Sequence, residues 1–153
     1  MSYSYNQGIY EIKNKDKYIG TKNPRYLSSY ELEFFRWADN NAGVLKWGAE
    51  VVVVPYMNPS KVDQYGNMKK SRYIVDIYVK YKTKTGEIKE ELIEIKPYQQ
   101  LSKPKRGKKK QHWYDQEVLT YQQNCAKWEA AKKYAESKGM KFKILTEQNI
   151  FKR

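Results

Sequence analysis

The chain has 153 residues, of which 30 are lysine or arginine and 17 are aspartate or glutamate, so its formal net charge is +13. This length suits one domain with a hydrophobic core, and we expect residues 1–153 to form a single domain. Aromatic residues make up 15% of the chain, which excludes a disordered basic tail. The single cysteine, Cys125, excludes an intramolecular disulfide and a cysteine-rich zinc site.

The surplus of basic residues indicates a polyanionic partner, with nucleic acid ahead of an acidic membrane surface. The apolar runs are only a few residues long, so we expect none of them to span a membrane. Residues 1–6 lack the charged and then apolar pattern of a secretory signal. We therefore expect a soluble protein of a reducing compartment that is not secreted.

The first elements along the chain are an arm and a helix. Residues 1–25 are polar and rich in tyrosine, and they predict an arm or hairpin that packs only partly on the domain. A helix is expected from Ser28 or Ser29 to Asn40, because either serine can cap it and Gly43 follows its end. Its inward face should consist of Leu27, Glu31, Phe34, Phe35 and Ala38.

Three strands should follow this helix. The β-branched run at Glu50–Val54 is too short for a helix and is ended by Pro55. Residues 57–71 contain several turn formers and predict a loop. The segments 73–81 and 91–96 predict a second and a third strand, joined by a tight turn into a hairpin.

The last third of the chain predicts a loop, a helix and a strand. Residues 98–112 form a strongly basic loop, and Val118–Ser137 supports a long helix. Cys125 falls on the apolar face of this helix, where we expect it to be packed. The segment 142–145 predicts a final short strand. The resulting order of elements is α-β-β-β-α-β.

Asp76, Glu94 and Lys96 are the residues that indicate chemistry. Glu94 and Lys96 are two positions apart on a strand and therefore point to the same face, and the hairpin can bring Asp76 beside them. Two converging carboxylates repel each other unless a cation lies between them, and Mg²⁺ suits such a pair. Lys96 can orient or deprotonate an attacking water. The alternative is that the three residues form ordinary cross-strand ion pairs on a solvated face.

Glu31 favours a catalytic site over ordinary ion pairs. Its neighbours on the helix are apolar, so its face should pack inward against the sheet. A carboxylate is seldom buried without a partner, and a metal ion or Lys96 would provide one.

The helical glutamate, the Asp…Glu-x-Lys pattern and the order of elements resemble the PD-(D/E)xK nuclease superfamily. Longer segments resemble the head-completion nucleases of T-even-like tailed phages, over nearly the whole chain. A similar core occurs in the endonuclease subunit of some heteromeric transposases. The segments that carry the resemblance include 29–31, 45–50, 72–76, 92–97 and 124–128. The chain departs from the pattern at Val75, where the superfamily has proline, and at Leu27, where an arginine is expected.

The resemblance implies a mixed α/β (α+β) fold with a restriction-endonuclease-like αβββαβ core, in which helices flank a mixed central sheet. It implies a metal-dependent endodeoxyribonuclease that hydrolyses double-stranded DNA at or near packaged ends. Glu31, Asp76 and Glu94 would bind Mg²⁺, for which Mn²⁺ could substitute, and Lys96 would act on the water. Phage head, portal or neck proteins are the implied partners, and the implied location is the host cytoplasm during assembly, with association with the virion.

Basic residues near such a site are expected to bind DNA phosphates. The predicted set in the basic loop is Lys103, Lys105, Arg106, Lys108, Lys109 and Lys110. From the resemblance, Lys127 on the long helix should point toward the site. Trp113 could stack on an exposed base or belong to the core.

Two other functions are compatible with the sequence. One is a basic DNA-binding structural protein of the capsid or neck without catalysis. The other is a GIY-YIG nuclease, because Gly8-Ile9-Tyr10 and Tyr18-Ile19-Gly20 spell the two halves of that motif. The spacing between these halves is shorter than that family usually has.

Overall fold

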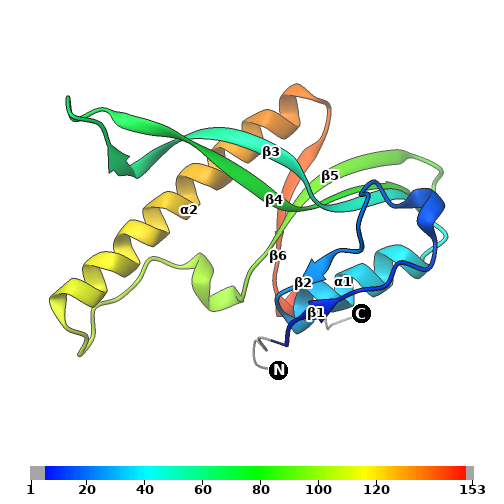
Figure 1. Cartoon of the computed structure of the whole chain (residues 1–153), viewed down its shortest axis with the longest axis horizontal. Helices are drawn as coiled ribbons and strands as arrows, with labels where there is room; N and C mark the ends of the chain where they lie inside the picture. The colour runs from blue at the N-terminus through cyan, green and yellow to red at the C-terminus, as the bar shows by residue number, and fades with distance from the viewer. Residues whose placement is uncertain (1–5, 151–153) are drawn as a thin grey trace.

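A computed structural model gives the fold, and it describes residues 6–150 (Figure 1). Short 3-10 turns occupy Lys15–Lys17 and Tyr98–Leu101. The helices and strands in chain order are β1 (Gly8–Ile9), β2 (Arg25–Tyr26), α1 (Ser29–Asn40), β3 (Val44–Val62), β4 (Met68–Lys82), β5 (Ile88–Ile95), α2 (Gln111–Ser137), β6 (Lys141–Leu145) and α3 (Glu147–Ile150).

The central sheet has four strands in the order β3-β4-β5-β6. The β3–β4 and β4–β5 pairs are antiparallel, whereas β5 and β6 are parallel. A parallel pair requires a crossover connection, and α2 supplies it. The sheet is therefore mixed and flanked by helices, which confirms the predicted fold class and the order α-β-β-β-α-β.

Two clusters of buried side chains hold helices against this sheet. The first joins α1 to the sheet and consists mainly of Phe34, Phe35, Ala38, Trp47, Ile77, Val79 and Ile93. The second joins α2 to the sheet and includes Val54, Val75, Leu92, Ala131 and Ala135. On β4, Val75 belongs to the second cluster and Ile77 to the first. Asp76 lies between them, so the boundary between the two clusters crosses β4 at this predicted catalytic residue.

Helix α1 begins as predicted from its cap. Ser28 has an extended backbone, and its Oγ accepts a hydrogen bond from the N–H of Glu31 at 3.2 Å. This bond satisfies one of the free N–H groups of the first turn. The predicted inward position of Leu27 is wrong, because Leu27 precedes the cap and is 40% exposed.

The largest error of the sequence prediction concerns Pro55, which was expected to end a strand, and residues 57–71, which were expected to form a loop. Strand β3 continues through Pro55 to Val62, and after a tight turn β4 starts at Met68, so these residues form a β-hairpin where a loop was expected. Strand β3 is an edge strand, where proline is tolerated because one side of the strand makes no ladder hydrogen bonds.

The prediction for α2 is wrong at its N-terminus. The helix begins at Gln111, seven residues before Val118. Its buried side chains are Ala131 and Ala135, which lie in its second half. Cys125 is exposed, which overturns its predicted packing. The first half of α2 extends away from the sheet (Figure 1), so its apolar positions have no core to face.

The N-terminal segment packs more closely than predicted. Strands β1 and β2 form a small antiparallel sheet, as the expected hairpin requires, and Tyr10 and Ile12 are buried in the first cluster. Residues 1–5 of the predicted arm lie outside the described residues. Among residues 6–150, no helix is both long and apolar enough to cross a membrane.

Candidate active site

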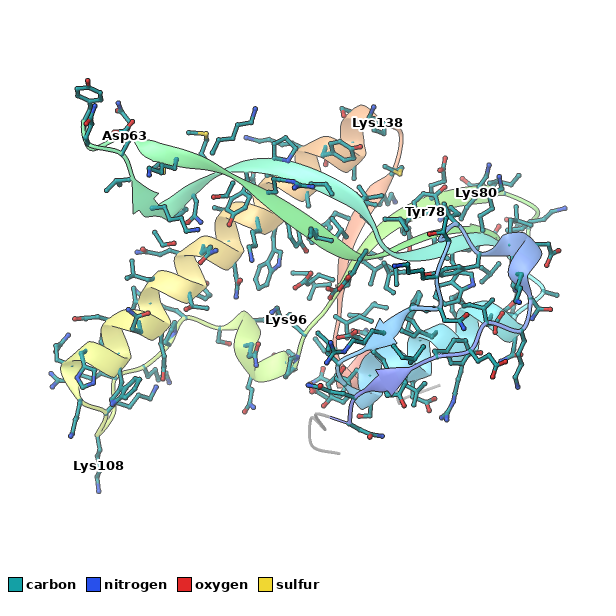
Figure 2. All side chains as sticks on the ribbon, viewed as in Figure 1. Asp63, Tyr78, Lys80, Lys96, Lys108 and Lys138 are labelled. Atoms are coloured by element: carbon teal, nitrogen blue, oxygen red, sulfur yellow. The ribbon has the colours of Figure 1, made fainter. Side chains whose placement is uncertain are left out.

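The four predicted catalytic residues line one cleft of about 400 Å³. They come from three elements, since Glu31 is on α1, Asp76 on β4, and Glu94 with Lys96 at the end of β5. Antiparallel pairing of β4 with β5 brings the strand of Asp76 beside the strand of Glu94, as the sequence pattern indicated. Figure 2 shows Lys96 at the point where the chain leaves the sheet.

The end of β5 is held in place from both sides. The N–H of Ile95 donates to Oδ2 of Asp76 at 2.9 Å, which ties β5 to β4. The N–H of Lys96 donates to the carbonyl of Leu145 at 3.0 Å, which ties it to β6. The Nζ of Lys96 lies 3.6 Å from Oε1 of Glu94, so these two side chains share a face as expected. The end of β5 is therefore held next to the middle of β4, where Asp76 lies, by contacts to its main chain.

Glu31 reaches the cleft from the first turn of α1. Its Oε2 accepts a hydrogen bond from the N–H of Leu27 at 3.3 Å. Burial raises the pKa of the Glu31 carboxyl, and the negative charges of Glu50 and Glu94 add to this effect. The Leu27 N–H and Lys96 oppose the shift but do not cancel it.

Asp76 is the most strongly perturbed group of the site. Burial raises its pKa well above the usual range, and the nearby charge of Glu94 raises it further. The N–H of Ile95 and the ammonium of Lys96 counteract only part of this effect. Three carboxylates thus share the cleft with a single lysine, and the resulting excess of negative charge favours an additional cation.

Two contacts of Glu94 involve residues that the sequence did not indicate. Tyr73 is buried and donates its hydroxyl hydrogen to Oε2 of Glu94. Burial and the charge of Glu94 raise the pKa of Tyr73, which keeps this hydroxyl protonated. The Nζ of Lys127 lies 5.7 Å from the centre of the Tyr73 ring, so Lys127 points toward the site through this tyrosine. Nothing in the sequence distinguishes Tyr73 from the other fourteen tyrosines.

Glu147 on α3 connects two segments of the site and was also missed. Its Oε2 accepts a hydrogen bond from the hydroxyl of Tyr30 at 2.9 Å, and its Oε1 accepts one from the N–H of Tyr98 at 2.9 Å. Tyr30 precedes Glu31, and Tyr98 lies two residues after Lys96. One carboxylate therefore links the start of α1 to the segment that follows β5.

The donors in the cleft suit a hard divalent cation. Mg²⁺ takes one or two carboxylates together with waters and substrate phosphates, and it seldom needs a complete cage of protein ligands. Within residues 6–150, no group of three or more His, Cys, Asp or Glu side chains is placed to hold a metal ion, so this part of the protein would supply only some of the ligands. Asp76 and Glu94 offer carboxylate oxygens, and Glu31 is a further acidic group of the cleft.

Comparison with known proteins places this chain in a nuclease family. Residues 41–147 match the family described as TnsA-like endonuclease N terminal. The chain belongs to this family. The matched segment contains Asp76, Glu94 and Lys96, and Glu31 precedes it. The chain is also 36% identical over 158 residues to the "Head completion nuclease" of Enterobacteria phage T4, covering 98% of this chain and 95% of the relative. The resemblance identified from the sequence is thereby confirmed.

The predicted DNA-binding residues of the basic segment begin near the candidate cleft of this TnsA-like domain and extend away from it. A second cleft of about 1020 Å³ is lined by Lys103, Lys105 and Lys109, and Gln100 borders both clefts. The other three basic residues of the set, Arg106, Lys108 and Lys110, are exposed on the same segment. Figure 2 shows Lys108 at the far tip of this segment, well away from Lys96. The set therefore extends outward from the site.

Two residues of this second cleft, Lys109 and Trp113, differ in how available their side chains are for a ligand. The Nζ of Lys109 lies 2.6 Å from Oε2 of Glu117 and also donates to the carbonyl of Lys105 at 2.9 Å, so its charge is partly used within the protein. Trp113 is 59% exposed, with its ring 4.7 Å from that of His112. Of the two expected roles for Trp113, a place in the core is therefore wrong.

The two halves of the GIY-YIG pattern have packing roles. Strand β1 pairs with β2 and not with the segment around Tyr18. The hydroxyl of Tyr10 donates to Oδ2 of Asp39 at 2.7 Å, and the ring of Tyr18 packs on Trp47 with 4.8 Å between ring centres. The two tripeptides therefore do not form the neighbouring strands that a GIY-YIG site requires.

Proposed function

We propose that this protein is a metal-dependent endonuclease that hydrolyses phosphodiester bonds of double-stranded DNA, at or near packaged ends, during phage head completion. The observation that carries this proposal is the gathering of Glu31, Asp76, Glu94 and Lys96 in one cleft. Membership in the TnsA-like endonuclease family and the name of the T4 relative support it.

The chain supplies both the metal ligands and a cation for this reaction. Asp76, Glu94 and the Ile95 carbonyl would hold Mg²⁺, or Mn²⁺ in its place, with Glu31 as a further acidic partner. The bound ion would polarise the phosphate and lower the pKa of a coordinated water. Lys96 would hold the attacking water and stabilise the negative charge that builds on the phosphate oxygens.

The proposed reaction is the hydrolysis of one phosphodiester bond by one water molecule. The water oxygen forms a bond to phosphorus while the bond between phosphorus and O3′ breaks. One proton of the water moves to the departing O3′, which leaves a 3′-hydroxyl, and the phosphate stays on the 5′ end. Lys96 would position the water for this attack, and the 3.6 Å contact of its ammonium with Glu94 supports this role.

The surplus of positive charge suits DNA as the substrate. The exposed basic residues from Lys103 to Lys110 begin beside the catalytic cleft, where they can bind phosphates of the strands that flank the cut. Lys127 would assist through its position over Tyr73. In the virion, proteins of the head, portal or neck are the proposed docking partners.

A plasmid assay tests this function. We expect the wild-type protein to convert supercoiled plasmid to nicked and linear forms in Mg²⁺ or Mn²⁺ and to lose this activity in chelator. Asp76→Ala and Lys96→Ala should each lower the rate by about 100-fold or more, the loss typical for a group that acts in the transition state. Lys82→Ala, which replaces an exposed lysine at the C-terminal end of β4, should retain full activity.

Two results would overturn the assignment. Undiminished cutting by both Asp76→Ala and Lys96→Ala would exclude this cleft as the active site. Salt-sensitive DNA binding with no cleavage in either divalent ion would identify the protein as a non-catalytic DNA-binding component of the capsid or neck.

A further inference from the structure

The paired ends of β3 and β4 form an arm that projects from the body of the protein. We define the hairpin arm as residues 57–70, and Figure 1 shows it at the upper left, beyond the region that α2 covers. Helix α2 holds only its base, where Gln123 donates to the hydroxyl of Tyr56 at 3.1 Å and accepts from Oγ of Ser60 at 3.4 Å. The tip, marked by Asp63 in Figure 2, extends free of the other elements.

The arm is built to hold its shape. At its base, the buried side chain of Asn58 accepts hydrogen bonds from the N–H and hydroxyl of Ser60 at 2.9 and 2.7 Å. At its tip, Oδ1 of Asp63 accepts hydrogen bonds from the N–H groups of Tyr65 and Asn67 at 2.8 and 3.0 Å. Gly66 has a φ of 81°, which glycine adopts without strain. The exposed side chains of the arm are therefore presented on a defined backbone.

The surface of the arm combines positive charge with apolar side chains. Lys61, Lys69 and Lys70 are exposed, and Asp63, the only acidic residue of the arm, is engaged in the turn. The exposed apolar side chains are Met57, Val62, Tyr65 and Met68, with Tyr65 at the tip 79% exposed. Apolar side chains gathered on a projecting and rigid element indicate a contact surface, and the lysines favour a polyanionic partner.

We propose that the hairpin arm is a second DNA-binding element that enters the major groove of the duplex beside the cleavage site. Two paired strands lie about 4.8 Å apart, and the major groove, about 12 Å wide, admits such a ribbon. The lysines then meet the phosphates on the groove edges, while Tyr65 and its apolar neighbours contact base edges, including thymine methyl groups. The inference depends on the proposed function only in taking DNA as the ligand.

The position of the arm on β4 sets where it meets the duplex. Lys70 and Asp76 are six residues apart on this strand, a separation of roughly 20 Å at about 3.3 Å per residue. That distance corresponds to about six base pairs. The arm therefore contacts the duplex on one side of the cut, while the segment from Lys103 to Lys110 contacts it from another element.

Two pairs of exposed lysines, one on the arm and one beyond the middle of β4, provide a matched test. Lys69→Gln with Lys70→Gln removes two charges from the arm, and Lys82→Gln with Lys84→Gln removes two exposed charges from the C-terminal end of β4 and the turn that follows it. Binding of the full-length protein to a labelled duplex of roughly 30 bp, about three helical turns, is measured by fluorescence anisotropy in chelator. The salt concentration is varied from about 50 to 200 mM.

The arm variant should reduce the slope of log affinity against log salt by about 1.8, because each lost phosphate contact contributes about 0.9. The control variant should leave the slope unchanged. Equal slopes for the two variants would overturn the proposal, since only overall charge would then matter. Because chelator prevents metal-dependent cleavage, this outcome is independent of whether the plasmid assay supports the nuclease function.

Tyr65 tests the apolar part of the contact. Tyr65→Ala should weaken duplex binding by about tenfold with an unchanged salt slope, as expected for the loss of an uncharged aromatic contact. Tyr65→Phe should bind like the wild type. Wild-type affinity for Tyr65→Ala would overturn the insertion of the tip into the groove.

Discussion

The hydroxyl of Tyr73 donates a hydrogen bond to the Glu94 carboxylate, and both side chains are buried, with Glu94 lining the candidate cleft. Tyr73→Phe removes this donor and keeps the ring under Lys127. Loss of a group that orients a metal ligand typically costs 10- to 100-fold in metal affinity or activity, so we expect a loss of about tenfold or more. Calorimetric titration with Mn²⁺ or Mg²⁺ in the absence of DNA measures the metal affinity, and plasmid cleavage measures the activity.

Tyr78→Phe is the matched control for this variant. Tyr78 also donates its hydroxyl hydrogen to a glutamate, Glu90, but on a part of the sheet that does not line the cleft. The Tyr78→Phe variant should bind metal and cut DNA like the wild type. If both variants lost metal affinity equally, the effect would come from the sheet as a whole and Tyr73 would have no special role.

Glu147 should position the catalytic residues without touching the substrate. Glu147→Ala removes the acceptor shared by Tyr30 and the N–H of Tyr98, which frees α1 from the segment after Lys96. Small displacements of catalytic groups can reduce turnover by about 100-fold, and we expect a loss between about tenfold and 100-fold in the rate of cleavage. DNA affinity in chelator should not change, so the loss should appear in kcat and not in KM.

A conservative variant separates positioning from general destabilisation. Glu147→Gln retains one carbonyl acceptor and should recover part of the activity. Gln148→Ala changes the exposed neighbour and should have no effect. A loss of DNA binding in Glu147→Ala would argue that the residue shapes the binding surface, contrary to the positioning role.

The parts of this protein that could be predicted from sequence depend on local rules. The spacing of Phe34, Phe35 and Ala38 gives the inward face of α1, and the serine cap gives its start. Alternation along a strand places Glu94 and Lys96 on one face, and a hairpin brings Asp76 next to them. Each of these inferences uses residues close in sequence, for which helix and strand periodicity is sufficient.

The parts that were missed depend on tertiary context. Pro55 ends a strand in most settings, but on the edge of the sheet β3 continues past it, and the hairpin arm follows from that continuation. Tyr73 and Glu147 act through partners 21 and 49 residues away, and no local pattern indicates such pairs. The exposure of Cys125 has the same origin, since an amphipathic face of α2 is buried only where the sheet lies beneath it.

The basic segment should contribute to DNA binding through charge. A triple variant, Lys103→Gln with Lys105→Gln and Lys108→Gln, should lower the salt slope by about 2.7, which is three phosphate contacts at about 0.9 each. Lys109 is left in place because its ion pair with Glu117 supports the segment. Duplex binding in chelator measures the slope. The control variant, Lys132→Gln with Lys133→Gln in the C-terminal half of α2, should leave the salt slope unchanged. If the slope fell only in this control variant, the binding surface would lie on the C-terminal half of α2 and not on the basic segment.

Asp39 holds the N-terminal segment against α1 and should make stability depend on pH. Burial alone would raise its pKa, but hydrogen bonds from the Lys13 N–H, the Tyr10 hydroxyl and Asn14 lower it overall. The same burial and the bond to Asp39 raise the pKa of Tyr10 to about 12. Since the folded-state pKa of Asp39 lies below its unfolded value of about 3.9, its ionised form stabilises the fold above that pH. This contribution is lost as the pH falls through the folded-state pKa.

Asp39→Asn should therefore lower the free energy of unfolding at neutral pH by about 1–3 kcal/mol, the cost of weakened bonds to buried donors. The difference from the wild type should shrink below about pH 4, where the wild-type carboxylate also loses its charge. Thermal and urea unfolding across this pH range measure both effects. Asp16→Asn, at an exposed carboxylate of the same segment, should follow the wild type at every pH. A constant difference between Asp39→Asn and the wild type down to the lowest pH would show that shape, and not ionisation, governs the contact.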